Sequence, residues 1–322
     1  MDRFGGKIAV VTGGGTGMGR ELVRQLAAEG CHVATCDVSA ENLDDTTALA
    51  VAESPAGTHV TAFTADVSDE GQMLAFAAAV RTEHATEHIN LLFNNAGIGG
   101  GGSFVEDPRG EWDRTFAVCW GGVYNGCRAF MPMLLRSEEG HVVNTSSLNG
   151  FWASLGPNSP HTAYSAAKFA VKGFTEALIT DFRVNAPHLK ASVVMPGHIG
   201  TSIVFNSYVA HGRDPKQLTA EQCDDLRVRL TRMGFAVGDA SDEDLRAGLQ
   251  MQAEDFRDNA PVSAAQAATM ILDGVRAGEW RILVGDDARL LDVAVREDPL
   301  IAYEPSFLDT MAGRGITISI VR

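Results

Sequence analysis

The stretch from Lys7 to Asp37 restricts the possible folds of this chain more than any other. It begins with a short apolar run at residues 8–11 and continues with a glycine-rich turn, an amphipathic helical pattern and a second apolar run. The second run ends on the acid Asp37. A strand, a turn, a helix and another strand in this order have the length of a βαβ crossover. The stretch therefore predicts two parallel strands joined through a helix.

The turn of this unit has the pattern Thr12-Gly13-x-x-x-Gly17-x-Gly19. Glycine is needed where the backbone turns tightly, approaches a pyrophosphate without a Cβ and brings the helix against the sheet. The first amides of the helix would face the phosphates, and Asp37 would accept hydrogen bonds from an adenosine ribose. Glycines alone would also fit a tight turn without a ligand. The flanking strand, helix and acid favour a dinucleotide site.

The composition restricts the compartments and partners that we expect. The chain has 322 residues, of which 45% are apolar, and a net charge of −15. Such an acidic chain lacks the basic face that nucleic acids and anionic membranes require. The sequence shows no signal-peptide core and no 18-residue apolar run, and its five cysteines have no C-x-x-C spacing. We therefore expect a soluble cytoplasmic protein with reduced cysteines and no metal site.

Strand and helix patterns continue to alternate after the first unit. The expected elements are a helix over residues 39–53, a strand over 59–65, a helix over 68–83 and a strand over 89–93. Ser39 and Ser68 are the expected N-caps of the two helices. This rhythm of short buried strands predicts an α/β fold, a Rossmann-type doubly wound parallel sheet of about seven strands with helices on both faces.

Polar residues close three of the expected strands, namely Asp37, Asp66 and Asn94. Each alone would also suit a turn. Ligands of doubly wound sheets gather at the carboxyl ends of the strands, so the three together predict the adenosine side of a nucleotide site. A carboxylate at Asp37 repels the 2′-phosphate of NADP, and Val38-Ser39 supply no compensating base. NAD is therefore expected in preference to NADP.

A second motif carries acid–base chemistry. A strand over residues 141–145 leads into Ser147, and Tyr164-x-x-x-Lys168 opens a long helical pattern. The four-residue spacing places the phenol and the ammonium on one helix face. The ammonium and an oxidised nicotinamide would lower the phenol pKa from about 10 toward the working pH, where acid–base catalysis is efficient. Ser147 would hydrogen-bond the substrate oxygen. Exposed helices often carry such Tyr–Lys pairs, so the interpretation depends on the preceding serine and the nucleotide motif.

Together these motifs resemble the short-chain dehydrogenase/reductase family over about residues 7–285. The resemblance is carried by the glycine turn, Asn94-Asn95-Ala96-Gly97, the set Ser147, Tyr164 and Lys168, and Pro196-Gly197-His198-Ile199-Gly200-Thr201. It implies that Ser147, Tyr164 and Lys168 are catalytic and that Lys168 also reaches the nicotinamide ribose. Ser147 is preferred to Ser146 because Leu148-Asn149-Gly150 matches the x-x-Gly that follows the family's active serine.

The resemblance also implies the cofactor contacts. Asp66 and Val67 would contact the adenine, and Asn94 would brace the sheet beside it. Ile199 and Thr201 would bind the nicotinamide carboxamide. The full set of expected cofactor residues is Gly13, Thr16, Gly17, Met18, Gly19, Asp37, Asp66, Val67, Asn94, Ala96, Gly97, Tyr164, Lys168, Pro196, Gly197, Ile199 and Thr201.

Two long helical patterns, at residues 110–136 and 164–184, bear on assembly. In the family that this chain resembles, two such helices pair with their copies in a neighbouring subunit. Plain core helices would show the same apolar spacing. The resemblance therefore implies a homodimer or homotetramer, whereas the periodicity alone leaves the question open.

One position departs from the family's pattern. Cys119 stands where the family commonly carries an asparagine that relays protons through water to the lysine. A thiol is a weak hydrogen-bond donor and acceptor. A small buried hydrophobe is the simpler interpretation of this cysteine.

The βα rhythm stops at residues 202–259, which have a helical and partly apolar pattern. By resemblance this segment is a lobe covering the substrate, within a dinucleotide-binding domain of residues 1–285. Its apolar residues, with Phe151 and Trp152, suggest a hydrophobic substrate, although a lobe with its own core would look the same. A helix capped by Ser263 and a strand over 281–284 would complete the domain. Residues 286–322 form a tail in which 315–321 would be a strand or an arm on a neighbour.

The sequence therefore predicts an NAD-dependent oxidoreductase that transfers hydride to or from a secondary alcohol or ketone, with Tyr164 as general acid and base. An epimerase or dehydratase that uses bound NAD remains possible on this scaffold. A non-catalytic dinucleotide sensor is the third possibility, but it would not need Ser147, Tyr164 and Lys168.

Overall fold

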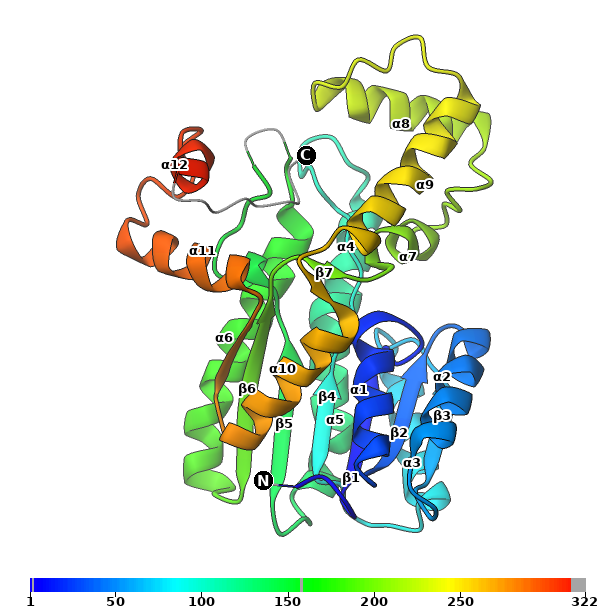
Figure 1. The fold of residues 1–322 in the computed structure, drawn as a ribbon, viewed down its shortest axis with the longest axis vertical. Helices are drawn as coiled ribbons and strands as arrows, with labels where there is room; N and C mark the ends of the chain where they lie inside the picture. The colour runs from blue at the N-terminus through cyan, green and yellow to red at the C-terminus, as the bar shows by residue number, and fades with distance from the viewer. Residues whose placement is uncertain (2, 157–158, 314–322) are drawn as a thin grey trace.

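The computed structural model describes residues 1, 3–156 and 159–313. A parallel sheet of seven strands, in the order β3-β2-β1-β4-β5-β6-β9, forms the centre of the molecule (Figure 1). The strands are β1 (Ile8–Thr12), β2 (His32–Asp37), β3 (Val60–Thr64), β4 (Leu91–Asn94), β5 (Gly140–Thr145), β6 (Leu189–Pro196) and β9 (Arg281–Val284). The strand order reverses between β1 and β4, which confirms the doubly wound fold.

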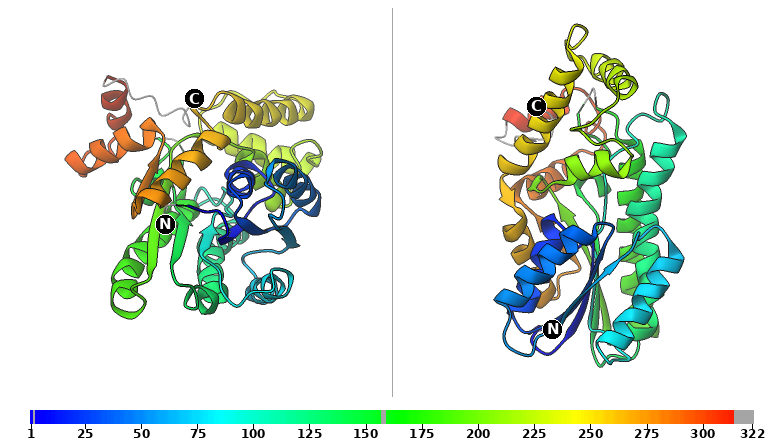
Figure 2. Two further views of the ribbon diagram at one scale, coloured as in Figure 1. Left: turned by 60° about the horizontal axis from the view of Figure 1, so that its bottom comes forward. Right: turned by 90° about the vertical axis from the view of Figure 1, so that its right-hand side faces the viewer.

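Helices cover both faces of the sheet, as the right-hand view of Figure 2 shows. One face carries α1 (Gly17–Ala28), α2 (Ala40–Glu53) and α10 (Ala264–Ala277), and the other carries α3 (Glu70–Glu83), α5 (Gly122–Leu134) and α6 (Thr162–Asn185). Along β1, the side chain of Val10 packs against α3, α5 and α6. The side chains of Ala9 and Val11 pack against α1, α2 and α10 on the opposite face. Both faces are therefore buried, which explains why the strand reads as a continuous apolar run.

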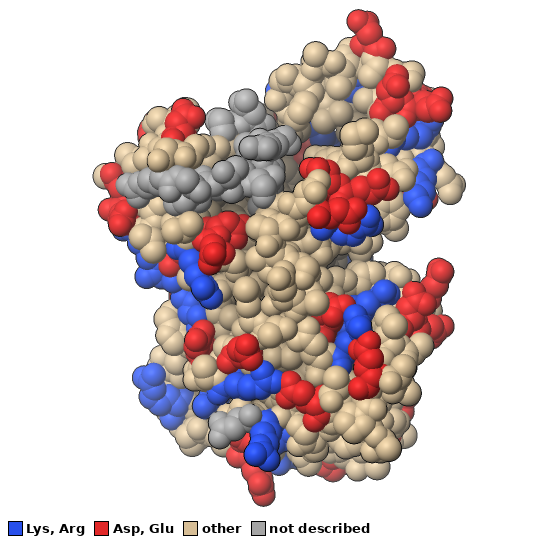
Figure 3. All heavy atoms as spheres, in the orientation of Figure 1, with Lys and Arg blue, Asp and Glu red and all other residues tan. Residues whose placement is uncertain are grey.

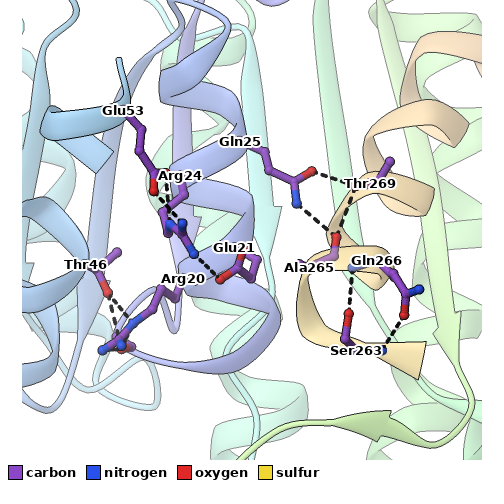
Figure 4. A network of polar contacts seen from close by, with 11 residues as sticks. Arg20, Glu21, Arg24, Gln25, Thr46, Glu53, Ser263, Ala265, Gln266 and Thr269 are labelled. Atoms are coloured by element: carbon purple, nitrogen blue, oxygen red, sulfur yellow. Dashed lines mark hydrogen bonds and ion pairs between the residues drawn. The ribbon is translucent and has the colours of Figure 1, made fainter. Parts of the chain in front are cut away.

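The helix α1 is joined to both of its neighbours, as Figure 4 shows. The amide of Gln25 donates to the carbonyl of Ala265 at 2.9 Å and accepts from the hydroxyl of Thr269 at 3.0 Å, both in α10. On the other side the guanidinium of Arg24 pairs with Glu53 at the end of α2. These contacts fix the helix that follows the glycine turn.

One of the two expected N-caps is wrong. Ser39 accepts from the amide of Asn42 and caps α2 as predicted. In α3 the cap is Asp69, which accepts from the amide of Gln72 at 3.0 Å. The hydroxyl of Ser68 instead donates to Asp66 at 2.7 Å, because the carboxylate is the stronger acceptor.

The first long helical pattern is interrupted. Residues 109–116 form α4 (Arg109–Phe116), and α5 begins at Gly122. Between them Ala117–Gly121 make a π-helical turn, with Cys119 at its centre. Such turns insert an extra residue into a helix and occur often at functional sites.

The segment 202–259 forms a lobe at the carboxyl edge of the sheet (Figure 1). It contains α7 (Ile203–Ala210), α8 (Ala220–Arg232) and α9 (Asp242–Asp258), while the short strands β7 (Ile199–Gly200) and β8 (Val262–Ser263) pair at its base. The lobe has an apolar core of its own, made by Leu218, Cys223, Leu226, Leu245 and Leu249. Much of its apolar content is therefore used within the lobe.

The tail folds back on the domain through α11 (Asp286–Glu297) and α12 (Phe307–Gly313). Trp152 is 1% exposed, packs against Phe307 and donates from its indole N–H to the carbonyl of Ala302 at 2.7 Å. The expectation that Trp152 marks a hydrophobic substrate site is therefore wrong, because the tail covers this side chain. The predicted strand or arm at 315–321 lies outside the described residues.

Acidic side chains are spread over the face of the molecule seen in Figure 3, including the lobe and the tail. All five cysteines are free and buried. Within residues 1, 3–156 and 159–313, no helix has both the length and the hydropathy to cross a membrane.

Candidate active site

Two cavities that share a wall open at the carboxyl edge of the sheet, at the switch between β1 and β4. The first has a volume of about 470 Å³ and the second of about 430 Å³. Met18, Asn95, Gly97, Thr201 and Ile203 line both. The residues expected to bind a dinucleotide and those expected to catalyse therefore line two adjacent cavities with a common wall.

The glycine turn forms part of the first cavity. A Cβ on Gly13 would lie 2.7 Å from the Cα of Ala96, and Gly17 has φ +54°, which only glycine adopts without strain. The helix α1 starts at Gly17 without a side-chain cap and without an acid in its first turn. Its first N–H groups and positive dipole are thus left for an anion, which fits the phosphates of a dinucleotide.

The turn is held from behind by Arg20. Its Nε and Nη2 donate to the carbonyl of Gly15 at 2.9 and 2.6 Å, and Nε also donates to the hydroxyl of Thr46 (Figure 4). From the lobe, the amide of Asn206 donates to the hydroxyl of Thr16 at 3.1 Å. The lobe and α2 therefore both fix the geometry of the turn.

Asp37 stands at the wall of the first cavity. Its carboxylate accepts from the amide of Gly15 at 3.0 Å and from the amide of Ser39 at 3.1 Å. Two backbone donors thus orient the group at the end of β2, where a ribose hydroxyl is expected.

Farther along this wall, Asp66 pairs with Arg114 at 2.8 Å. Burial raises the pKa of Asp66, but hydrogen bonds from Ser68 and the Arg114 guanidinium outweigh it and hold the pKa below its usual range. Arg114 lines the cavity and had no signal in the sequence, because it lies on α4 and meets Asp66 only through the fold.

The second cavity contains Ser147, Tyr164 and Lys168. The ammonium of Lys168 is buried, donates to the carbonyl of Thr145 at 2.9 Å and lies 5.3 Å from the centre of the Tyr164 ring. Ser147 lines the same cavity and lies close enough to Tyr164 to lower the pKa of the phenol. The serine at the end of β5 and the two residues on α6 are therefore brought together as predicted.

The pKa of Tyr164 is shifted upward. Burial raises it, while the Lys168 ammonium and the hydrogen bond with Ser147 act in the opposite direction. The expectation that Lys168 lowers the phenol pKa is right for its own contribution, but the protein groups together leave the phenol protonated at neutral pH. Burial outweighs the ammonium because it removes the phenolate from water.

His161 is a further residue of this cavity that the sequence analysis missed. Its ring packs on the ring of Tyr164 at 4.7 Å between centres. Burial lowers its pKa to about 4, so the imidazole is neutral at pH 7. It contributes shape and a polar surface beside the phenol, but no charge.

Cys119 is fully buried, and its thiol donates to the carbonyl of Ile98 at 3.0 Å. A Cβ on Gly97 would lie 3.4 Å from the Lys168 ammonium and 3.8 Å from the Cys119 sulfur. The π-helical turn therefore places the thiol beside the second cavity, where the family's asparagine is expected.

Most of the predicted site residues line one of the two cavities. The exceptions are Gly19 and Asn94, which stand behind the walls. A Cβ on Gly19 would lie 2.0 Å from the carbonyl oxygen of Gly13, so this glycine serves the packing of the turn. The amide of Asn94 donates to Asn144 at 2.8 Å and braces β4 against β5. Its neighbour Asn95 lines both cavities and was not among the predicted residues. It belongs to the motif Asn94-Asn95-Ala96-Gly97, so the sequence contained a signal for it.

Comparison with known proteins agrees with this geometry. The family model described as short chain dehydrogenase matches residues 7–209. The Mycobacterium tuberculosis protein that carries the name oxidoreductase SadH is 35% identical over 296 residues, which are 92% of each chain.

Solved structures give the same result. A short-chain dehydrogenase/reductase from Burkholderia phymatum, in complex with NAD, has a TM-score of 0.67 and 27% identity and covers 99% of this chain and 98% of its own. A metagenomic short-chain oxidoreductase in complex with NADP has a TM-score of 0.53 and 31% identity and covers 60% of this chain and 83% of its own. The chain therefore belongs to the short-chain dehydrogenase/reductase family and is an oxidoreductase.

Proposed function

We propose that the enzyme transfers hydride between NAD and a secondary alcohol or ketone, and that Tyr164 is the general acid and base. The observation that carries the proposal is the meeting of Ser147, Tyr164 and Lys168 in a cavity that shares a wall with the cavity expected to hold the dinucleotide. When bound, NAD supplies the nicotinamide that accepts hydride in one direction and donates it in the other.

The chain's own residues perform the proton chemistry in this proposal. Ser147 orients the substrate oxygen by a hydrogen bond and holds it against the phenol of Tyr164. The phenol gives its proton to that oxygen during reduction and removes it during oxidation. Lys168 stabilises the phenolate and is anchored by the carbonyl of Thr145. Ile199 and Thr201 would hold the nicotinamide carboxamide, since Thr201 lines both cavities and Ile199 lines the second.

NAD is proposed rather than NADP because of the charges beside the expected ribose. Asp37 points a carboxylate at that position, and two backbone amides hold it there. The nearby guanidinium of Arg20 is engaged by the Gly15 carbonyl and Thr46. Arg114, which lines this cavity, is paired with Asp66. Among the described residues of the wall, a 2′-phosphate would therefore meet an anion and no unpaired cation.

The substrate is proposed to have an apolar body. The second cavity is lined by Leu155, Ile199, Ile203, Val204, Met233 and Phe256 as well as by the polar catalytic groups. The lobe supplies several of these side chains, which supports its role as the cover of the substrate.

The test is the formation of NADH with a panel of hydrophobic secondary alcohols, with Tyr164→Phe as the blank. Release of free NADH with substrate supports the dehydrogenase, whereas conversion of substrate without free NADH supports the epimerase or dehydratase. Binding of NAD without any turnover supports the sensor. Turnover that survives in Tyr164→Phe removes this residue from its proposed role.

We also propose a homodimer or homotetramer that is formed through the α4–α5 and α6 helices and is located in the cytoplasm. Exposed apolar side chains on these helices, Tyr124, Phe169 and Val184, support the pairing, and the five free cysteines support a reducing compartment. The domain would extend over residues 1–285, with the tail as an addition. Light scattering coupled to size-exclusion chromatography tests the assembly.

A further inference from the structure

The lobe contributes charged side chains to the catalytic cavity. Besides Lys168, the charged residues of the lining are Arg213 and Arg229 from the lobe and Glu111 from α4. The lining thus has three cations and one carboxylate, although the whole chain has a net charge of −15. Even with Asp107, which also pairs with Arg229, the cations outnumber the carboxylates by three to two, and an excess of positive charge favours an anionic ligand.

Glu111 orients both arginines. It is 8% exposed, pairs with Arg213, and accepts from Nη2 of Arg229 at 2.9 Å. Burial raises the pKa of Glu111, but its bonds with Arg229 and Arg213 outweigh burial and keep the carboxyl ionised. The two guanidinium groups are therefore fixed side by side at one carboxylate.

The backbone at Arg213 is also fixed. The helix α7 ends in a Schellman motif, in which the amide of Arg213 donates to the carbonyl of Tyr208 and the amide of Gly212 donates to the carbonyl of Val209, both at 2.9 Å. Gly212 has φ +75°, as this motif requires. The motif sets the direction in which the arginine leaves the helix.

The two arginines differ in how fully they are paired. Arg229 lies between two carboxylates, since it also reaches Asp107 at 3.4 Å. Among the described residues, Arg213 pairs with Glu111 alone and uses one nitrogen, Nη2, for that contact. No described residue accepts a hydrogen bond from its Nε or Nη1, so each of them can donate to a ligand. A charged guanidinium with such donors can form charge-assisted hydrogen bonds with a carboxylate.

We propose that Arg213 binds a carboxylate of the substrate, so that the enzyme acts on a hydroxy acid or an oxo acid with an apolar body. The proposal rests on the proposed function, because it assigns the substrate class of that reaction. In this arrangement Glu111 and Arg229 position Arg213 and do not touch the substrate. The apolar wall formed by residues such as Val204 and Met233 contacts the carbon chain.

The test measures binding, with hexanoate and hexanamide as probes of equal length. Each is titrated calorimetrically into the protein with and without saturating NADH. The binding of NADH is first measured by its own fluorescence, so that a failure of the dinucleotide site is recognised separately. We expect hexanoate to bind at least about tenfold more tightly than hexanamide to the NADH complex, which corresponds to about 1.4 kcal/mol. Arg213→Gln should abolish this preference, and Arg213→Lys should leave part of it.

The matched control is Arg232→Gln. Arg232 belongs to the same helix α8 as Arg229, pairs with Glu106 at 2.7 Å and lines a neighbouring cavity instead of the catalytic one. This variant should keep the full preference for hexanoate. Equal binding of the two probes to the unmodified protein, or a preference that survives in Arg213→Gln, would overturn the proposal. Tighter binding of hexyl phosphate than of hexanoate would overturn the choice of a carboxylate. If Arg213→Gln fails to fold, the proposal is tested by two other results. The unmodified protein must prefer hexanoate to hexanamide, and Arg213→Lys must retain only part of this preference.

Discussion

The carboxylate of Asp287 accepts a hydrogen bond from the backbone amide of His198 at 2.7 Å. Asp287 is in the first turn of α11, and His198 is in the loop that follows β6 and contains Gly197, where a Cβ would lie 2.1 Å from the Asp287 carboxylate. The tail thus holds the loop that is expected to contact the nicotinamide. The ring of His198 packs on Phe256 and bonds to its carbonyl, so this histidine has a structural explanation.

This contact predicts that Asp287→Ala weakens NADH binding about tenfold and lowers kcat, because a buried amide loses a charged acceptor worth about 1.5–3 kcal/mol. Asp287→Asn retains an acceptor and should lose less. Dissociation constants from NADH fluorescence and kcat from steady-state assays measure the two effects. Asp286→Ala is the control, since the Asp286 side chain is 91% exposed. An equal loss in both alanine variants would show that the loop does not depend on Asp287.

The pKa shift of Tyr164 makes a prediction about pH. Because burial raises the phenol pKa, alcohol oxidation, which needs the phenolate, should become faster as the pH rises toward that pKa. Ketone reduction needs the neutral phenol and should become slower over the same range. Lys168→Met removes a charge that lowers the pKa of Tyr164. The rise of the oxidation rate and the fall of the reduction rate should therefore both occur at higher pH.

The profiles are measured as kcat at saturating NAD or NADH, which separates the pKa effect from any loss of cofactor binding. Lys172→Met is the control, because Lys172 lies one turn farther along α6 and pairs with Glu176. It should leave the profiles in place. If the pH profiles of kcat do not shift in Lys168→Met, the proposed role of the Lys168 ammonium is contradicted.

A third prediction concerns Cys119. Its thiol reaches the carbonyl of Ile98 from the π-helical turn, and an asparagine amide can donate to the same carbonyl. Cys119→Asn should therefore hold or raise turnover, whereas Cys119→Ala should retain the fold and lose only the contact with Ile98. Steady-state kcat measures both variants. A hundredfold loss in Cys119→Asn would show that the thiol has a role that packing does not explain.

The features of this fold that could be predicted from the sequence are those that depend on residues close together in the chain. The order of strands and helices, the glycine turn and the Tyr164–Lys168 spacing depend on neighbours within a few residues, and periodicity and turn chemistry reveal these. The interruption of the first long helix at Cys119 was not predictable in this way, because a π-helical turn preserves the apolar spacing on both sides.

Contacts between distant segments explain the other differences. Trp152 has an apolar side chain five residues after Ser147, and only the return of the tail shows that Ala302 and Phe307 cover it. Asn206 meets Thr16 across 190 positions of sequence. Asp287 belongs to a tail beyond the region that the motifs cover. No pattern in a single sequence connects such pairs, since their proximity depends on how the whole chain packs.

The last prediction concerns the choice of dinucleotide at Asp37. A carboxylate about 4 Å from a phosphate in a partly shielded site costs up to about 4 kcal/mol per pair of unit charges, before solvent and salt reduce it. Asp37→Asn removes the charge, preserves the volume and keeps an acceptor for the Gly15 or Ser39 amide. The ratio of kcat/KM for NADPH to that for NADH should therefore rise at least about tenfold. Asp44→Asn, an exposed acid on α2, is the control and should leave the ratio unchanged. If the ratio stays the same in Asp37→Asn, the repulsion is not what separates the two dinucleotides. Asn42, which also lines this wall, is then the next residue to test.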